Sequence, residues 1–440
     1  MKFYNRQVEL AQLEKIGQRA KESAQLTFVV GRRRIGKTSL LLKAYNDSST
    51  LYFFVAKKNE ALLCAEFVEQ IEQKWGETVY GEFKQFKTLF AWLIDRSRSK
   101  HFTLIIDEFQ EFQTVNASVF SELQAIWDLH HKTSKMNWVC CGSVYALMTR
   151  IFENAKEPLF GRANQRLHLK AFDVATLEEI LLDYAPNFSN EDLLAFYAFT
   201  GGVAKYVELL MEQKATTKEA MLEMMLSEDS LFLDEGKNVL IDEFGKEYGN
   251  YFSILSLIAS GKTARVEMES IMEMQIGGFL DRLEQEFGLI KKVRPILAKP
   301  TSRSLKYEIN DHFLRFWFRF IYRNRSAIEA GNLGYIRSVV ARDYVGFSGK
   351  TLERFFIDRL KSLQKFNQIG TYWERQNTNE IDIVAIDQLN KSILIAEVKR
   401  NPEKIQREQL KQKASNLLAN FNNFEVHYKS YSLVQMRQTL

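Results

Sequence analysis

Proline, cysteine and long apolar runs are scarce in this sequence, and each scarcity excludes a class of protein. Five prolines among 440 residues, with no low-complexity tract, argue against long flexible linkers. The three cysteines, Cys64, Cys140 and Cys141, cannot form a disulfide framework, and no Cys/His spacing indicates zinc. No run of about eighteen apolar residues occurs, and the opening MKFYNRQVEL lacks the apolar core of a signal peptide. We therefore expect a cytoplasmic protein with no membrane partner.

The composition is that of a folded protein with more than one domain. Hydrophobic residues make up 46% and charged residues 26% of the chain, which is too long for one ordinary core. The net charge is +5, but acidic residues predominate from 171 to 290 and basic residues predominate on either side. A basic final third predicts a polyanionic partner such as nucleic acid. The alternative is a solvated basic surface that faces the chain's own acidic middle.

The first 170 residues alternate strand-like apolar runs with longer amphipathic stretches, which is typical of a parallel α/β sheet. The strand-like runs are Leu26–Val30, Leu51–Val55, Phe102–Ile106 and Trp138–Cys141. From 171 to about 240 the apolar residues recur with the period of a helix, interrupted at Gly201 and Gly202. This second region predicts a small helical lid.

Residues from 241 to 325 have the pattern of a winged helix-turn-helix. Short helices are expected at Tyr251–Ala259, Val266–Met272 and Gly278–Phe287, and strand-like runs follow at Leu289–Ile296 and Leu305–Ile309. In such a module the third helix reads DNA and the hairpin forms the wing. Here the third helix is acidic, so it suits a protein contact as well as a DNA groove. The lysines of the wing are the better phosphate binders.

One loop matches the phosphate-binding motif G-x-x-x-x-G-K-[ST], between a strand-like run and a helix-like run. Backbone N–H groups of such a loop point at phosphate oxygens, and the helix start adds its dipole. Lys37 would bridge the β- and γ-phosphates of ATP, while the Thr38 hydroxyl would coordinate Mg²⁺. The residues predicted to bind the nucleotide are Gly31, Arg32, Arg33, Arg34, Ile35, Gly36, Lys37, Thr38, Ser39, Asp107 and Ser143.

Polar residues after two further strands extend this predicted ATP site. Asp107 ends an apolar run and is expected to hold Mg²⁺ together with Thr38, while Glu108 is expected to polarise the attacking water. Ser143 follows the run Trp138–Cys141 and is a candidate sensor of the γ-phosphate. Arg162 is a candidate to stabilise transition-state charge in a neighbouring subunit, which implies a homo-oligomer. The alternatives are ordinary exposed acids at a strand end and an ordinary surface arginine.

These motifs resemble the archaeal-type ATPases, which belong to the STAND branch of the AAA+ ATPases. The resemblance is carried by AsnArg at 5–6 with GluLeu at 9–10, the P-loop, AspGluPheGln at 107–110, GlySer at 142–143, LeuPheGlyArg at 159–162 and AspHisPheLeuArgPheTrpPheArgPhe at 311–320. It implies an α/β P-loop ATPase core at 1–170, a helical lid at 171–240, a winged helix-turn-helix at 241–325 and a nuclease-like domain of the PD-(D/E)xK type at 326–440. One departure is that the usual Gly-Gly-x-Pro reads Gly-Gly-Val-Ala at 201–204.

The final region also carries a second constellation of charged residues. Asp382 lies on one strand-like run, and Glu397-Val398-Lys399 ends the next, where alternation places Glu397 and Lys399 on one face. Two carboxylates there can share a Mg²⁺ that activates water against a phosphodiester, with the lysine orienting that water. Glu353 fits the family's additional acidic position, and Glu380 is a weaker fifth member. We predict Glu353, Asp382, Glu397 and Lys399 as catalytic residues, and Asp382 and Glu397 as metal ligands.

These features together predict a Mg²⁺-dependent ATPase whose nucleotide state controls a DNA-directed C-terminal domain, with endonuclease activity as a further hypothesis. DNA would be bound through the wing and the C-terminal domain. The alternative is an ATP-driven regulatory switch whose nuclease-like domain is catalytically inactive and binds protein or DNA. A sequence-specific transcription factor is the third reading, which the acidic third helix of the winged module disfavours.

Overall fold

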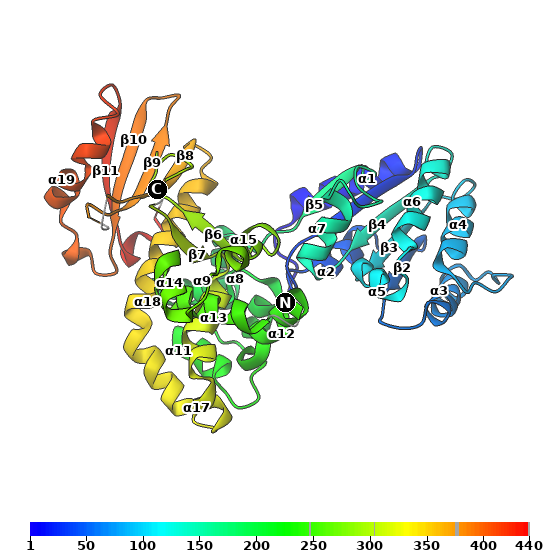
Figure 1. Cartoon of the computed structure of the whole chain (residues 1–440), viewed down its shortest axis with the longest axis horizontal. Coiled ribbons are helices and arrows are strands. Elements are labelled where there is room, and N and C mark those ends of the chain that lie inside the picture. Colours follow the sequence, from blue (N-terminus) through cyan, green and yellow to red (C-terminus); the bar gives the residue numbers. More distant parts are fainter. Residues whose placement is uncertain (246–247, 303, 375–377, 439–440) are drawn as a thin grey trace. The chain divides into compact units, whose positions relative to one another are not determined.

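The computed structural model describes residues 1–245, 248–302, 304–374 and 378–438, and it divides into two compact units (Figure 1). The N-terminal unit comprises Phe3–Ala171 and Val203–Lys205. The C-terminal unit comprises Met1–Lys2, Phe172–Gly202 and Tyr206–Leu440. None of the helices in the described part of the chain has both the length and the apolar character needed to cross a bilayer.

The N-terminal unit is built on a five-stranded sheet in the order β2-β3-β4-β1-β5, in which every neighbouring pair is parallel. This confirms the predicted α/β fold class. The strands are β1 (Gln25–Val30), β2 (Thr50–Phe54), β3 (Phe102–Asp107), β4 (Met136–Cys141) and β5 (Gln165–His168). Every residue of β3 and β4 is buried, as expected for central strands covered on both faces.

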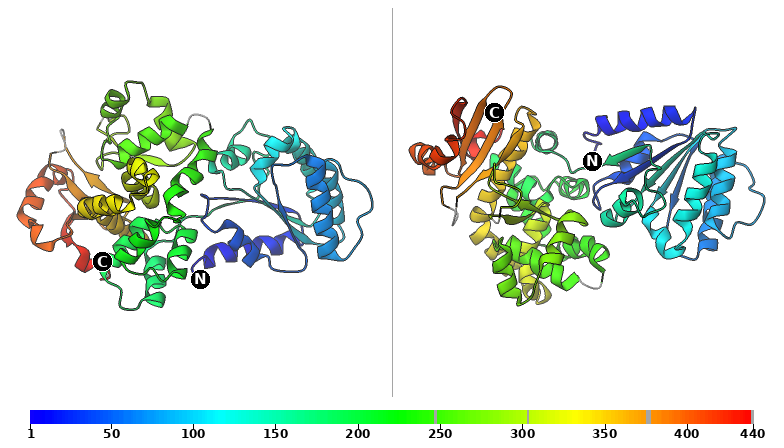
Figure 2. Two further views of the ribbon diagram at one scale, coloured as in Figure 1. Left: turned by 90° about the horizontal axis from the view of Figure 1, so that it is seen from below. Right: turned by 45° about the horizontal axis from the view of Figure 1, so that its top comes forward.

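Helices cover both faces of this sheet. Helix α1 contacts β1 and β4 on one side, and α3 and α4 lie on the other side (Figure 2). That second side holds an apolar core in which residues of β1–β4 pack against aromatic side chains from the helices, including Phe67, Phe90 and Phe152. The helices are α1 (Gln7–Ala20), α2 (Lys37–Ala44), α3 (Glu60–Trp75), α4 (Phe86–Arg96), α5 (Phe112–Val115), α6 (Val119–His130) and α7 (Tyr145–Glu153).

The C-terminal unit opens with helices, as the change of sequence period predicts. Helix α9 (Asn190–Thr200) is buried along its whole length from Asp192 onward. It starts with a capping box in which Ser189 and Asp192 satisfy each other's backbone N–H groups. The other helices here are α8 (Val174–Tyr184), α10 (Ala204–Glu212), α11 (Lys218–Met225) and α12 (Phe232–Phe244).

Three short helices and a two-stranded antiparallel sheet follow, close to the ranges expected for the winged module. The helices are α13 (Tyr248–Ala259), α14 (Arg265–Met272) and α15 (Gly277–Gln285), and the strands are β6 (Ile290–Val293) and β7 (Lys306–Ile309). Acidic residues of α15 pair with the hairpin itself, since Lys292 Nζ lies 3.1 Å from Asp281 and 2.7 Å from Glu284. The assignment of this module as a winged helix-turn-helix stays a prediction.

The last region is a four-stranded mixed sheet flanked by helices. The order is β11-β10-β9-β8, where β10 and β11 are parallel and the other pairs are antiparallel. Apolar side chains of β9 and β10 pack against α19. The elements are α16 (His312–Phe316), a π-helical turn (Trp317–Ile321), α17 (Arg325–Glu329), α18 (Leu333–Ser362), β8 (Gln368–Tyr372), β9 (Ile381–Asp387), β10 (Ser392–Val398), α19 (Arg407–Leu418) and β11 (Glu425–Tyr431).

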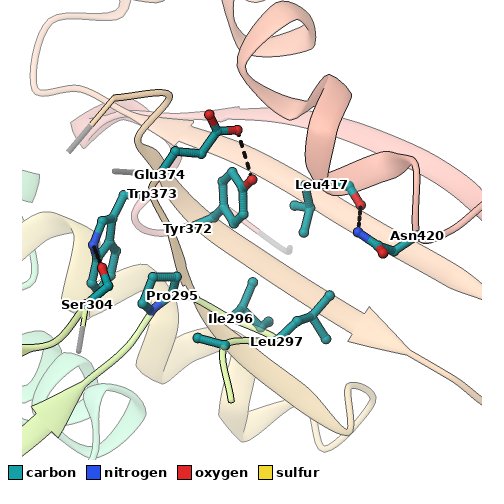
Figure 3. A pocket seen from close by; sticks show the side chains of 10 residues that line it. Pro295, Ile296, Leu297, Ser304, Tyr372, Trp373, Glu374, Leu417 and Asn420 are labelled. Atoms are coloured by element: carbon teal, nitrogen blue, oxygen red, sulfur yellow. Dashed lines mark hydrogen bonds between the residues drawn. The ribbon is translucent and has the colours of Figure 1, made fainter. Parts of the chain in front are cut away.

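A pocket of about 290 Å³ lies between the segment after β6, the end of β8 and α19 (Figure 3). Ile296 and Leu417 contribute apolar walls, and the Tyr372 hydroxyl donates a 3.0 Å hydrogen bond to Glu374 at the edge. None of the residues predicted to form the ATP site or the C-terminal site lines this pocket.

Candidate functional sites

The phosphate-binding loop joins β1 to α2, and its glycines are required by its backbone. Gly36 has φ of 95°, in the left-handed region that favours glycine. A Cβ atom on Gly31 would lie 2.7 Å from the carbonyl oxygen of Leu169. The Lys37 ammonium donates to the carbonyl oxygens of Gly31 at 2.8 Å and Arg32 at 3.1 Å, within the same loop. The loop therefore holds its own lysine at the start of α2, where backbone N–H groups attract phosphate.

Asp107 lies at the end of β3, and its carboxylate accepts hydrogen bonds from four donors. Its Oδ2 accepts hydrogen bonds from the hydroxyls of Thr38 at 2.6 Å and Tyr52 at 2.8 Å. Its Oδ1 accepts from the Cys141 thiol at 3.0 Å and from the Glu108 N–H at 2.9 Å. The predicted pair Thr38 and Asp107 is thus brought together. Tyr52 and Cys141 are members of this site that the sequence analysis missed.

Asp107 is only 5% exposed, yet its carboxyl group is held in the charged form. Burial on its own would raise its pKa, because charge is disfavoured away from water. Hydrogen bonds from Thr38, Cys141 and Tyr52 outweigh burial and lower the pKa below its ordinary value. A buried carboxylate beside a hydroxyl is a hard oxygen pair of the kind that magnesium prefers.

Glu108 follows directly and is held in the left-handed region with φ of 53°. Its Oε2 accepts a 2.8 Å hydrogen bond from the Ser143 hydroxyl, a 3.3 Å bond from the Ser143 N–H, and a further bond from the Gln110 side chain. A Cβ atom on Gly142 would collide with Gln110 Oε1 at 1.9 Å. The two residues predicted as water activator and phosphate sensor are therefore in direct contact. Gln110, buried within the same AspGluPheGln motif, is a further member that sequence reasoning missed.

Arg162 lies apart from the contacts just described. Its guanidinium pairs with Asp128 at 3.1 Å and donates to the Phe160 carbonyl oxygen at 2.9 Å. Its role toward a neighbouring subunit stays a prediction.

In the C-terminal unit, Asp382 of β9 and Glu397 of β10 are brought together by Lys399. The Lys399 ammonium lies 3.3 Å from Asp382 Oδ2 and 3.4 Å from Glu397 Oε1. The register explains this, because Ile383 pairs with Ala396 and the next antiparallel step places Asp382 opposite Glu397. Both carboxyl side chains are buried, and the Val398 N–H donates a 2.8 Å hydrogen bond to Asp382. Burial alone would lower the pKa of Lys399, but the two carboxylates raise it above its ordinary value.

Glu353 of α18 belongs to the same neighbourhood. Its carboxylate is paired at 3.0 Å with Lys350, whose ammonium also lies 3.6 Å from Glu380. Burial raises the pKa of Glu353 to about 7; the positive charge of Lys350 opposes this shift and the negative charge of Asp382 adds to it. Within the described ranges, no three His, Cys, Asp or Glu side chains are grouped in a way that could hold a metal ion. The four acidic side chains Glu353, Glu380, Asp382 and Glu397 are instead paired with lysines, chiefly Lys350 and Lys399.

The loop, the acidic end of β3 and the parallel sheet together define the N-terminal unit as a P-loop ATPase. In a comparison with known families, residues 3–210 match the model of an ATPase domain found predominantly in Archaea. Residues 317–424 match a family described as archaeal and bacterial proteins of unknown function. These two matches, over separate stretches of the chain, confirm the resemblance to archaeal-type ATPases.

Two known proteins are similar over most of the chain. An uncharacterized protein of Methanocaldococcus jannaschii is 29% identical over 408 residues, which cover 90% of this chain and 87% of that protein. The solved structure of a Walker-type ATPase of Pyrococcus abyssi has a TM-score of 0.54 and 16% identity, covering 72% of this chain and 96% of that one. The second likeness concerns the fold alone.

Proposed function

We propose that ATP hydrolysis by the N-terminal unit depends on a divalent cation and that the nucleotide state controls a DNA-directed site in the C-terminal unit. The single observation that carries the second part is the placement of Lys399, whose one ammonium group lies within 3.4 Å of the carboxylates of both Asp382 and Glu397. Two carboxylates from neighbouring strands and a lysine meet there, which is a combination that phosphodiester hydrolysis uses.

Thr38 and Asp107 are the residues that would hold Mg²⁺ at the ATP site, because their oxygen atoms lie 2.6 Å apart and Asp107 is kept ionised. Bound magnesium would neutralise charge on the β- and γ-phosphates. Lys37 would exchange its two carbonyl partners for phosphate oxygens. Glu108 would accept a proton from the attacking water, and Ser143 would donate to the γ-phosphate.

At the C-terminal site, Asp382 and Glu397 would supply carboxylate ligands to a divalent cation, which would polarise the phosphodiester and its attacking water. Lys399 would move its ammonium from the carboxylates toward the phosphate and neutralise developing charge. Glu353, with its pKa near 7, can hold or release a proton close to neutral pH. The wing supplies fewer free charges for DNA than the sequence suggests, because Lys292 pairs with α15 and Lys291 lies 3.5 Å from Glu308.

A specific observation favours a second candidate, a regulatory switch whose C-terminal domain binds DNA or protein without cutting it. Among the described residues, no set of three ligands is positioned for a metal, and Lys399 already forms ion pairs with both carboxylates. Such a domain would keep the shape of a nuclease and use its lysines only to contact phosphates.

One experiment separates the two candidates. Full-length protein is incubated with labelled DNA and Mg²⁺ or Mn²⁺, with and without ATP, beside the Asp382→Ala and Lys399→Ala variants. Cleavage that disappears in both variants supports the nuclease, while cleavage that survives both is contamination. A DNA mobility shift without cleavage supports the switch. The exposed Lys411→Ala variant, on the neighbouring helix α19, is the matched control for a lost lysine.

The cation-dependent ATP site is tested by Lys37→Ala, which should abolish nucleotide binding or turnover. Lys43→Ala, an exposed lysine on the same helix, should leave both unchanged. Normal ATP hydrolysis by Lys37→Ala would refute the site assignment. Removing divalent cations with a chelator should stop turnover in the wild-type protein, and restoring Mg²⁺ should recover it.

A further inference from the structure

Arg400, the residue immediately after Lys399, forms an ion pair with a helix far away in the sequence. Its Nη2 pairs with Glu191 Oε2 of α9 at 2.6 Å, and its Nη1 donates a 2.7 Å hydrogen bond to the buried Ser348 hydroxyl of α18. The two charged side chains are only 18% and 23% exposed. A partly buried pair is screened little by salt, and losing one partner leaves a charge without compensation. This contact therefore fixes the end of β10.

Helix α9 carries the other partner of this ion pair and is held firmly in place. Glu191 lies in its first turn, which the Ser189–Asp192 capping box locks. Further along, the Tyr197 hydroxyl donates a 2.7 Å hydrogen bond to Asp358 of α18, the helix that also carries Glu353. Figure 1 shows α9 beside α18, and the two helices are in contact. A displacement of α9 would thus act on two of the elements that build the C-terminal site, α18 and the end of β10.

After the last turn of α9, the chain continues directly into the N-terminal unit. The helix ends at Gly201 and Gly202, whose φ angles of 56° and 71° lie in the left-handed region. The next residues, Val203–Lys205, belong to the N-terminal unit, where the Lys205 N–H donates a 3.2 Å hydrogen bond to the carbonyl oxygen of Arg34 in the phosphate-binding loop. One continuous segment therefore touches the P-loop at one end and Arg400 at the other.

We propose that the Glu191–Arg400 ion pair transmits the nucleotide state of the P-loop to Lys399. Phosphate binding acts on the backbone of Arg33–Gly36, the contact with Lys205 passes this to α9, and Glu191 sets the position of Arg400 and hence of its neighbour Lys399. Arg400 is a positioning residue in this scheme. This coupling extends the proposed function, and its consequence for DNA rests on that proposed function. Coupling between two sites requires an element whose position depends on both sites, and in this scheme α9 with its Glu191–Arg400 pair is that element.

The test uses the full-length chain and variants that remove one charge, Glu191→Gln and Arg400→Gln. Hydrogen exchange of the segment 392–400 is measured with and without a non-hydrolysable ATP analogue. We expect at least a threefold change in exchange rate on nucleotide binding in the wild type, and no change in either variant. The kcat and KM of ATP hydrolysis should stay within twofold of wild type. The double variant Glu191→Arg with Arg400→Glu should recover part of the response, which a general folding defect would not allow.

Arg437→Gln is the matched control, because Arg437 also pairs with a helix of this region, at 3.4 Å from Glu178 of α8, but is not adjacent to Lys399. It should keep the wild-type response. The inference is overturned if the wild-type segment does not respond to nucleotide, if either single variant responds like wild type, or if Arg437→Gln abolishes the response equally. A response that depends on Glu191 and Arg400 in a protein that never cleaves DNA would support the coupling and refute only the nuclease.

Discussion

The Ser143 hydroxyl donates a 2.8 Å hydrogen bond to the same oxygen of Glu108 that also accepts a bond from Gln110. A serine hydroxyl carries one proton, so it can donate either to Glu108 or to a phosphate oxygen, but not to both. In this structure the candidate water activator is therefore held by the candidate phosphate sensor. Nucleotide with a γ-phosphate would turn the Ser143 hydroxyl toward a phosphate oxygen and leave Glu108 without this donor.

Substituting Ser143→Ala should therefore lower kcat for ATP hydrolysis while leaving nucleotide binding nearly unchanged. Loss of one donor to transition-state charge costs roughly 10²-fold in rate. We expect a fall in kcat of that order and a KM within threefold of wild type, measured by steady-state phosphate release. Ser99→Ala, at an exposed serine, is the control. Unchanged kcat in Ser143→Ala would exclude a role for this hydroxyl in turnover.

Asp107 should make the stability of the protein depend on pH in the acid range. Its folded-state pKa lies below its ordinary value, so the unfolded chain takes up a proton first as the pH falls. The stabilisation is complete above the unfolded pKa of about 4 and is lost as pH falls through the folded pKa. Asp107→Asn should lose roughly 1–3 kcal/mol at pH 7, because four donors lose a charged acceptor, and this deficit should shrink below pH 4.

The measurement is the urea midpoint of unfolding between pH 3 and pH 7 for the wild type and Asp107→Asn. Asp95→Asn, at an exposed carboxyl group on α4, serves as the control and should follow the wild type closely. Parallel curves for Asp107→Asn and the wild type would contradict the assignment of a depressed pKa.

The P-loop was predictable because its signal is local. A strand, a loop with glycines at fixed positions and a helix follow each other within twenty or so residues, and the chemistry needs only that order. The same holds for Asp107 and Glu108 at the end of an apolar run. The partners Tyr52 and Cys141 were not predictable, because they reach Asp107 only through the strand order β2-β3-β4, which no short segment encodes.

The missed strands have a common physical cause. Strand β5 (Gln165–His168) lies at the edge of its sheet and buries only Leu167, so its sequence has no apolar run. Strands β8 and β11 are the two edges of the C-terminal sheet and are largely half-exposed. By contrast, β9 and β10 are buried at every position, and the strand-like runs predicted to carry Asp382 and Glu397 correspond to them. A strand is recognised in the sequence by the apolar residues that it buries, and edge strands bury few of them.

Glu353 should give the opposite pH dependence to Asp107. Its folded pKa of about 7 lies above the ordinary value of 4.5, so the folded state keeps a proton that the unfolded chain releases. The contribution of Glu353 to stability is therefore complete below about pH 4.5 and is lost as the pH rises through about 7. Glu353→Gln removes this dependence and should be more stable than wild type at pH 8, by roughly 1–3 kcal/mol.

Urea midpoints between pH 5 and pH 8 test this, with Glu408→Gln at an exposed glutamate of α19 as the control. A wild-type midpoint that stays level across this range would show that Glu353 is ionised throughout. The same variant should also lower DNA cleavage if Glu353 holds a proton in the reaction, so stabilisation with loss of activity is the expected combination.

Gly202 should tolerate no side chain. Its φ of 71° is unfavourable for other residues, and a Cβ atom would lie 2.1 Å from the carbonyl oxygen of Phe172, whose own N–H donates a 2.8 Å bond to Gly202. Backbone cannot retreat as a flexible side chain does, so Gly202→Ala should destabilise the C-terminal unit by several kcal/mol. Gly346→Ala, in the middle of α18 where a Cβ meets open space, should instead stabilise by about 0.5–1 kcal/mol. Thermal unfolding of both variants decides the matter, and a Gly202→Ala protein that melts with the wild type would show that this turn is free to rearrange.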